Sequence, residues 1–142
     1  MGGKHTLVTD VALDKLREVR RFVESSARAL GVNEPAVSDL VLAVDEAVTN
    51  IIVHGYKNQP GSVEISIDAD GTALIVRLRD KAPEFDPCSY PKLDLRSSLE
   101  KDIPGGFGLH LIHNAVDDIG YRILRAGENE LTLVKRNAIP FQ

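Results

Sequence analysis

The stretch Leu40–Tyr56, LVLAVDEAVTNIIVHGY, decides the fold. Apolar residues recur here, and just before it, at three- and four-residue spacing, which predicts one amphipathic helix. The apolar stripe consists of Val37, Leu40, Val41, Val44, Val48, Ile51 and Ile52. The opposite face carries Asp39, Ala43, Glu46, Asn50 and His54. We therefore expect a helix anchored by one face and available for chemistry on the other.

Glu46 and Asn50 lie one helical turn apart on this second face, so their side chains project side by side. A carboxylate beside a neutral amide suits holding a divalent cation and orienting a nucleophile. An ordinary solvated polar face would show the same two residues. The rest of the chain has to decide between these interpretations.

Length and composition are typical of one soluble domain over residues 1–142. Hydrophobic residues make up 43% and charged residues 27%, both ordinary values for a globular protein. The formal net charge of −4 gives no electrostatic reason to expect binding to nucleic acid or to an anionic membrane.

Cysteine use and the first residues indicate a cytoplasmic protein. The one cysteine, Cys88, has no partner for an internal disulfide, as is usual in a reducing compartment. No apolar run follows Met1, and no segment reaches the ~20 apolar residues of a membrane span.

The chain before the central helix predicts a strand over His5–Val8 and a helix over Leu13–Leu30 that ends at Gly31. Asn33 is expected to cap the central helix. After that helix the period changes to two, which predicts an antiparallel hairpin of residues 63–68 and 74–79 around Asp70-Gly71.

The segment 81–104 has no sustained period and carries four prolines, and we interpret it as a lid. A short helix over Leu109–Val116 follows, then a second hairpin whose turn is Gly127-Glu128-Asn129. This order predicts an α+β fold, a two-layer α/β sandwich in which helices cover one face of a mixed, mostly antiparallel sheet.

Three separate pieces carry candidate chemistry. Glu46 and Asn50 form the first, and Asp80 at a strand end, followed by KAPEFDP, forms the second. The third is GGFG at residues 105–108, because glycines that open a helix let backbone amides approach a phosphate. Alone, GGFG is as often a tight turn, and it is neither a Walker motif nor a dinucleotide fingerprint.

Together these pieces resemble the GHKL ATPase superfamily, and within it the bacterial anti-sigma-factor serine kinases. EAVTNIIVHGY at residues 46–56 is similar to the N box of that family. DKAPEFDP at residues 80–87 resembles its first glycine box, and GGFGLHLI at 105–112 its second. The resemblance covers about residues 5–135.

The resemblance implies a Bergerat-type ATP-binding fold with an ATP lid at about residues 86–104. Asn50 would hold Mg²⁺ through its side-chain oxygen, Glu46 would orient or deprotonate a serine hydroxyl, and Asp80 would accept a hydrogen bond from the adenine amino group. The other implied nucleotide-binding positions, which cradle the phosphates or wall the base, are Ala82, Phe85, Gly105, Gly106, Phe107, Gly108 and Leu109.

The function implied by the resemblance is ATP-dependent phosphorylation of a serine on an anti-sigma-factor antagonist, combined with sequestration of a sigma factor. Members of the family often form homodimers. The chain departs from the family at Ala82, where glycine is usual, and at Pro104, near which some relatives place an arginine. Lys92, Arg96 or Lys101 in the lid could supply that charge, although each also suits a solvated loop.

Two alternatives stay open at this stage. The departures motivate a nucleotide-gated binding module with weak or no kinase activity. If residue 82 needs a positive φ angle, alanine there costs roughly 1 kcal/mol. A histidine-kinase catalytic domain is the other alternative, but the first predicted helix carries no histidine to phosphorylate.

Overall fold

The computed structural model describes residues 3–83 and 106–140, with the backbone alone for residues 106–110. No helix within these ranges combines the length and the apolar character needed to cross a bilayer. The elements in chain order are β1 His5–Asp10, η1 Leu13–Lys15, α1 Leu16–Ala29, α2 Glu34–Asn50, η2 Ile51–Gly55, β2 Ser62–Asp70, β3 Ala73–Asp80, α4 Gly106–Ala115, β4 Asp118–Ile123, η4 Arg125–Gly127 and β5 Asn129–Lys135.

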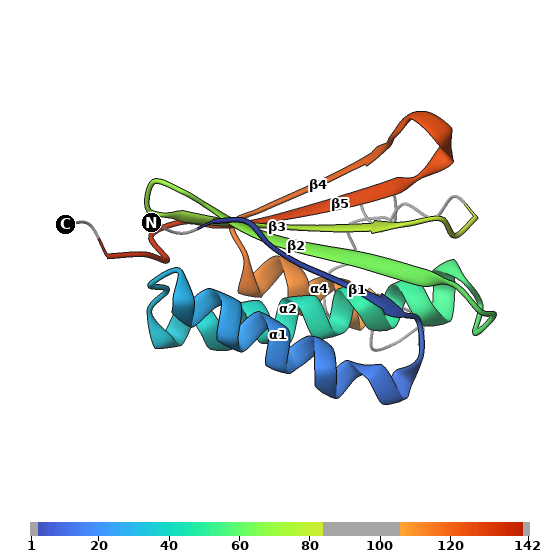
Figure 1. The fold of residues 1–142 in the computed structure, drawn as a ribbon, viewed down its shortest axis with the longest axis horizontal. Helices are drawn as coiled ribbons and strands as arrows, with labels where there is room; N and C mark the ends of the chain where they lie inside the picture. Colours follow the sequence, from blue (N-terminus) through green and yellow to red (C-terminus); the bar gives the residue numbers. More distant parts are fainter. Residues whose placement is uncertain (1–2, 84–105, 141–142) are drawn as a thin grey trace.

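One five-stranded sheet has the order β1-β2-β3-β5-β4. Helices α1, α2 and α4 all lie on the same face of this sheet (Figure 1). The predicted α+β two-layer sandwich is confirmed. All four strand pairings are antiparallel, so the expectation of a mixed sheet is corrected for the described strands.

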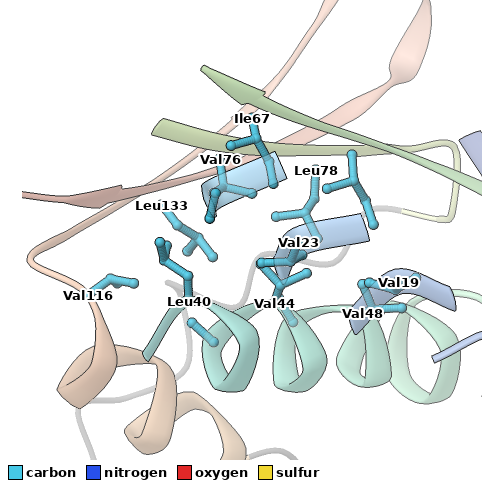
Figure 2. Packing of buried hydrophobic residues seen from close by; sticks show 14 of the residues in the cluster. Val19, Val23, Leu40, Val44, Val48, Ile67, Val76, Leu78, Val116 and Leu133 are labelled. Atoms are coloured by element: carbon cyan, nitrogen blue, oxygen red, sulfur yellow. The ribbon is translucent and has the colours of Figure 1, made fainter. Parts of the chain in front are cut away.

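The core fills the space between the sheet and the helices (Figure 2). Leu40 and Val44 of α2 meet Val76 and Leu78 of β3, and each of these four side chains is fully buried. Burying one such side chain contributes about 1.5–3 kcal/mol. The apolar stripe of α2 therefore anchors this helix firmly under the sheet, as its spacing predicts.

The ends of α1 and α2 follow local sequence rules. Gly31 closes α1 with a φ angle of +85°, which glycine adopts without steric cost. Asn33 caps α2 as expected, because its Oδ1 accepts a hydrogen bond from the Ala36 amide at 2.9 Å. The first helix differs from expectation at its start, since a 3₁₀ turn occupies Leu13–Lys15 and the α-helix begins at Leu16.

An ion-pair row crosses the outer face of the sheet. Glu130 is 1% exposed and accepts hydrogen bonds from Arg79 and Arg122, both at 2.7 Å. Burial works to raise the pKa of Glu130, but the hydrogen bonds and charges of the two arginines outweigh it and hold that pKa below its ordinary value. The row fixes β3, β5 and β4 against one another beside the pair of Asp80 with Asn129.

Candidate functional site

Asn50 and Glu46 are brought to the junction where α2 changes its winding. Asn50 is the last α-helical residue, and a single π turn, η2, follows it and is closed by the hydrogen bond from the Tyr56 amide to the Ile51 carbonyl at 2.8 Å. The sequence predicts one uniform helix through the stretch Leu40–Tyr56, so the π turn is a correction. Such turns are frequent at functional sites because they redirect the residues around them.

Asn50 lies on a covered part of its helix face, which differs from the alternative interpretation of an ordinary solvated face. Helix α4 packs against α2, so Ala43 is fully buried and Asn50 is only 7% exposed. The Asn50 side chain makes no hydrogen bond to any residue in the described part of the chain. A buried amide left without a partner costs about 1–3 kcal/mol. Its oxygen is therefore free to bind a ligand or a hard cation, which fits a magnesium ligand.

Glu46 lies one turn before Asn50 and is partly exposed. Burial raises the pKa of its carboxyl group, and the neighbouring charge of Asp45 raises it further. Asp45 itself is paired with Arg20 of α1 at 2.7 Å. A carboxylate with a raised pKa is a better proton acceptor than an ordinary surface glutamate, and this property suits a general base.

Asp80 ends β3 with its side chain on the inner face of the sheet, 8% exposed. Its Oδ1 accepts two hydrogen bonds of 2.9 Å, from the Asn129 side-chain amide and from the Ala82 backbone amide. Burial raises the pKa of Asp80 in spite of these two donors, and the charge of Glu128 adds to the effect. The carboxylate is thus held in place through Oδ1 at the edge of the core, while its Oδ2 has no donor among the described residues.

Asn129 and Tyr121 are further candidate site residues that the sequence did not predict, because Asn129 was expected in a turn. Asn129 is the first residue of β5 and lies directly opposite Asp80 in the ladder. Its Oδ1 accepts a hydrogen bond from the Tyr121 hydroxyl at 2.7 Å. The sequence held one signal for Asn129. It continues the inward alternation of Leu131 and Leu133, and a polar side chain buried at such a position requires a hydrogen-bond partner.

The turn after Asp80 is held from the helix side by Tyr56. The Tyr56 hydroxyl accepts a hydrogen bond from the Lys81 amide at 2.9 Å and donates one to the Ser62 carbonyl at 2.8 Å. Gly61 leaves room for the tyrosine ring, because a Cβ at position 61 would overlap that ring. The end of the central helix and the turn carrying Asp80 are thereby joined.

Ala82 fits its position without the backbone strain considered above. It is 5% exposed, and its φ angle is not among the positive values found in the described residues. Its methyl group lies beside Gly55, where an added Cβ would come within 3.2 Å of the Ala82 Cβ. Glycine at position 55 thus makes room for alanine at position 82.

This pairing gives a prediction about stability. We expect Gly55→Ala alone to lower the free energy of unfolding by about 1–2 kcal/mol, because the two methyl groups crowd each other. In the Ala82→Gly background the same change should be neutral or slightly stabilising, because alanine favours helical backbone. Urea denaturation of the two single variants and the double variant measures the coupling. Additive effects would contradict the packing described here.

Helix α4 begins at Gly106, three residues earlier than the expected Leu109. Phe107, Gly108 and Leu109 therefore lie in its first turn, where backbone amides have no partner within the helix and can bind an anion. In Figure 1, α4 runs beside α2 in the opposite direction, so its start lies toward the end of α2 that carries Asn50. Phe85, Gly105 and the expected lid, with its lysines and arginine, lie outside the described residues.

The arrangement can hold a phosphorylated purine. One end of the sheet presents an acceptor at Asp80, and α4 supplies backbone amides. The helix beneath presents Glu46 and the Asn50 amide, which no residue in the described part of the chain hydrogen-bonds. Among the described residues there is no cluster of three or more His, Cys, Asp or Glu side chains that could hold a metal ion. These features define a candidate ATP site of the histidine kinase-like type.

Comparison with known families supports this class. Residues 9–135 match the histidine kinase-like ATPase domain family, and the chain belongs to it. The sequence resemblance to the GHKL anti-sigma-factor serine kinases is confirmed by relatives named as such, described next.

The serine/threonine-protein kinase BtrW of Bordetella bronchiseptica is 29% identical over 100 residues, which are 70% of each chain. The serine-protein kinase RsbW of Bacillus cereus is 29% identical over 105 residues, 71% of this chain and 66% of the relative. The anti-sigma F factor of Bacillus licheniformis is 31% identical over 87 residues, 58% of either chain.

Solved structures show the same fold. The RsbU and RsbW domains of Rv1364c from Mycobacterium tuberculosis align with a TM-score of 0.68 at 18% identity. That alignment covers 99% of this chain, which spans about a third (33%) of the other. The SiaB–SiaC complex from Pseudomonas aeruginosa aligns with a TM-score of 0.62 at 17% identity, over 90% of this chain and 88% of that one.

Proposed function

We propose that this protein is an ATP-dependent protein serine kinase that also acts as an anti-sigma factor. Its substrate is a serine of an anti-sigma-factor antagonist, and its second partner is a sigma factor. The proposal is carried by the buried Asn50, whose side chain has no hydrogen-bond partner among the described residues. It lies one turn from Glu46, in a helix that Tyr56 ties to the Asp80 turn. The names of the relatives BtrW, RsbW and anti-sigma F factor support the same activity.

Each residue has a role that its surroundings allow. Asp80 binds the adenine amino group through Oδ2, the carboxylate oxygen that has no hydrogen-bond donor among the described residues. Asn50 would hold Mg²⁺ through its side-chain oxygen, and the ion would supply positive charge that neutralises the phosphates. The amides of the first turn of α4 hold phosphate oxygens. Glu46, with its raised pKa, accepts the proton of the serine hydroxyl as that oxygen attacks the terminal phosphorus of ATP and ADP leaves.

Switching between partners follows from the product. A phosphoserine carries a charge of about −1.5 to −2 at neutral pH, whereas the serine is neutral. The phosphorylated antagonist therefore no longer fits a surface that accepted a hydroxyl beside Glu46, and a sigma factor can take its place. We include a homodimer in the proposal, because members of the family that the chain resembles often form homodimers.

The direct test mixes the purified protein with ATP, Mg²⁺ and small antagonist candidates encoded near its gene. Mass spectrometry should find one phosphoserine on an antagonist, and size-exclusion chromatography should show release of that antagonist after phosphorylation. Nucleotide and partner binding without phosphoryl transfer to any candidate would instead identify a nucleotide-gated binding module. Absence of ATP binding by well-folded protein would refute both functions.

A further inference from the structure

A chain of hydrogen bonds crosses three strands and ends on the purine-binding carboxylate. The Tyr121 hydroxyl of β4 donates to Asn129 Oδ1 at 2.7 Å. Asn129 Nδ2 of β5 then donates to Asp80 Oδ1 of β3 at 2.9 Å and to the Ala82 carbonyl at 3.0 Å. Asn129 is 4% exposed, so these bonds are shielded from water. Every polar atom of its side chain is in use.

These partners allow one orientation of the Asn129 amide. In that orientation Nδ2 faces two acceptors, the Asp80 carboxylate and the Ala82 carbonyl, while Oδ1 faces a donor hydroxyl. Turning the amide over would place the acceptor Oδ1 against two other acceptors, the Asp80 carboxylate and the Ala82 carbonyl. In a buried site such contacts between acceptors are costly, because none of them is paired with a donor. The Tyr121 hydroxyl therefore helps to fix which atom faces Asp80.

The fixed amide in turn fixes what Asp80 can recognise. Its Oδ1 is occupied by Nδ2 of Asn129 and by the Ala82 amide. Its Oδ2 has no hydrogen-bond partner among residues 3–83 and 106–140. These two donors favour the ionised carboxylate and so work against burial, which raises the Asp80 pKa. An ionised carboxylate can accept a hydrogen bond but cannot donate one. A ligand group that meets Oδ2 must itself be a donor.

We propose that Asn129, oriented by Tyr121, is the residue that sets nucleotide specificity by keeping Asp80 an acceptor. The site then selects a purine with an exocyclic amino group at C6 and rejects one with a keto oxygen there. This inference rests on the proposed function, since it concerns the same nucleotide site. Asn129 is a positioning residue in this scheme, because it acts through Asp80.

The test compares the binding of ATP and ITP, which differ at C6 by an amino group against a keto oxygen. Calorimetry in saturating Mg²⁺ should give the wild type a preference for ATP of at least about 100-fold. Asn129→Asp replaces the Nδ2 donor with an oxygen, so two carboxyl groups face each other and share a proton. Asp80 can then be protonated and donate a hydrogen bond to a keto group. We expect the preference to fall by about tenfold or more, mainly through weaker ATP binding.

Two further variants make the result decisive. Tyr121→Phe removes one hydroxyl, leaves Asn129 in place, and should lower the preference about threefold. The matched control is Asn137→Asp, the same exchange at an exposed position beyond the far end of β5, which should leave the preference unchanged. If Asn129→Asp does not fold, Tyr121→Phe decides alone.

An ATP-to-ITP ratio equal to that of the wild type in every folded variant would overturn the inference, even if both affinities fell, because a merely structural residue weakens the two ligands equally. A wild-type protein that binds neither nucleotide would instead refute the proposed function itself. The two failures are thus distinguishable in one set of titrations.

Discussion

Replacing Glu46 with glutamine is expected to reduce phosphoryl transfer by at least about 100-fold while ATP binding is retained. Glutamine keeps the size of the side chain but cannot accept the proton of the serine hydroxyl. The measurement is single-turnover transfer from ATP to the antagonist, with the dissociation constant of ATP determined in parallel. Equal losses of binding and transfer would contradict the role of Glu46 as a base.

The pH profile provides a second readout of the same residue. Burial and the Asp45 charge raise the pKa of Glu46, and a base acts only when ionised, so the transfer rate should fall as the pH drops through this raised pKa. Asp45→Asn is the matched control, because it keeps the base but removes the neighbouring charge. It should retain activity and move the acidic limb to lower pH, while it removes the exposed ion pair of Asp45 with Arg20.

The same pKa shift has a consequence for stability. A raised carboxyl pKa means that the folded state favours the protonated form, so the ionised Glu46 opposes folding above its folded-state pKa. Glutamine removes this opposition. The melting temperature of Glu46→Gln at neutral pH should therefore equal or exceed that of the wild type, which separates lost catalysis from lost folding.

Local patterns suffice to predict most elements around this site. The alternation in β2 and β3 predicts the hairpin, and the Asn33 cap and Gly31 set the connection between the helices. The same alternation places Asp80 at a strand end, where the structure has it. These features depend on neighbours in sequence, and for that reason they can be read before the fold is known.

Long-range features of the site are not contained in those patterns. Periodicity identifies the apolar stripe of α2, but whether the second face meets solvent depends on α4, which lies more than fifty residues further along the chain. For this reason the burial of Asn50 is not predicted. Asn129 is missed for a related reason, because only the register of β5 against β3 places it opposite Asp80.

The absence of strain at Ala82 also depends on tertiary structure. If only the local motif is considered, alanine at position 82 in place of the usual glycine suggests that the chain cannot form the same turn. The structure instead places the extra methyl group against Gly55, in a segment 27 positions earlier. One motivation for a module without kinase activity therefore disappears, because the backbone at Ala82 can hold Asp80 without a positive φ angle.

Asn50→Ala is expected to abolish the stabilisation of the protein by ATP in the presence of Mg²⁺ without destabilising the unliganded protein. The buried amide has no partner in the described residues, so its removal lifts a desolvation cost of about 1–3 kcal/mol, which offsets the packing lost with the side chain. As the proposed metal ligand, however, it should matter strongly for binding, and we expect roughly a 100-fold loss of affinity, or ~2.7 kcal/mol.

Thermal unfolding measures both effects at once. Wild-type protein with ligand at about 100 times its dissociation constant gains ~2.7 kcal/mol, and the gain should disappear when EDTA replaces Mg²⁺. Asn50→Ala should gain little or no stability from ATP, whether Mg²⁺ or EDTA is present. Thr49→Ala is the matched control, since the Thr49 hydroxyl donates a hydrogen bond to the Asp45 carbonyl of its own helix. This variant should keep the Mg²⁺-dependent shift. A destabilised Asn50→Ala variant that retained this shift would show that Asn50 serves packing and not the metal.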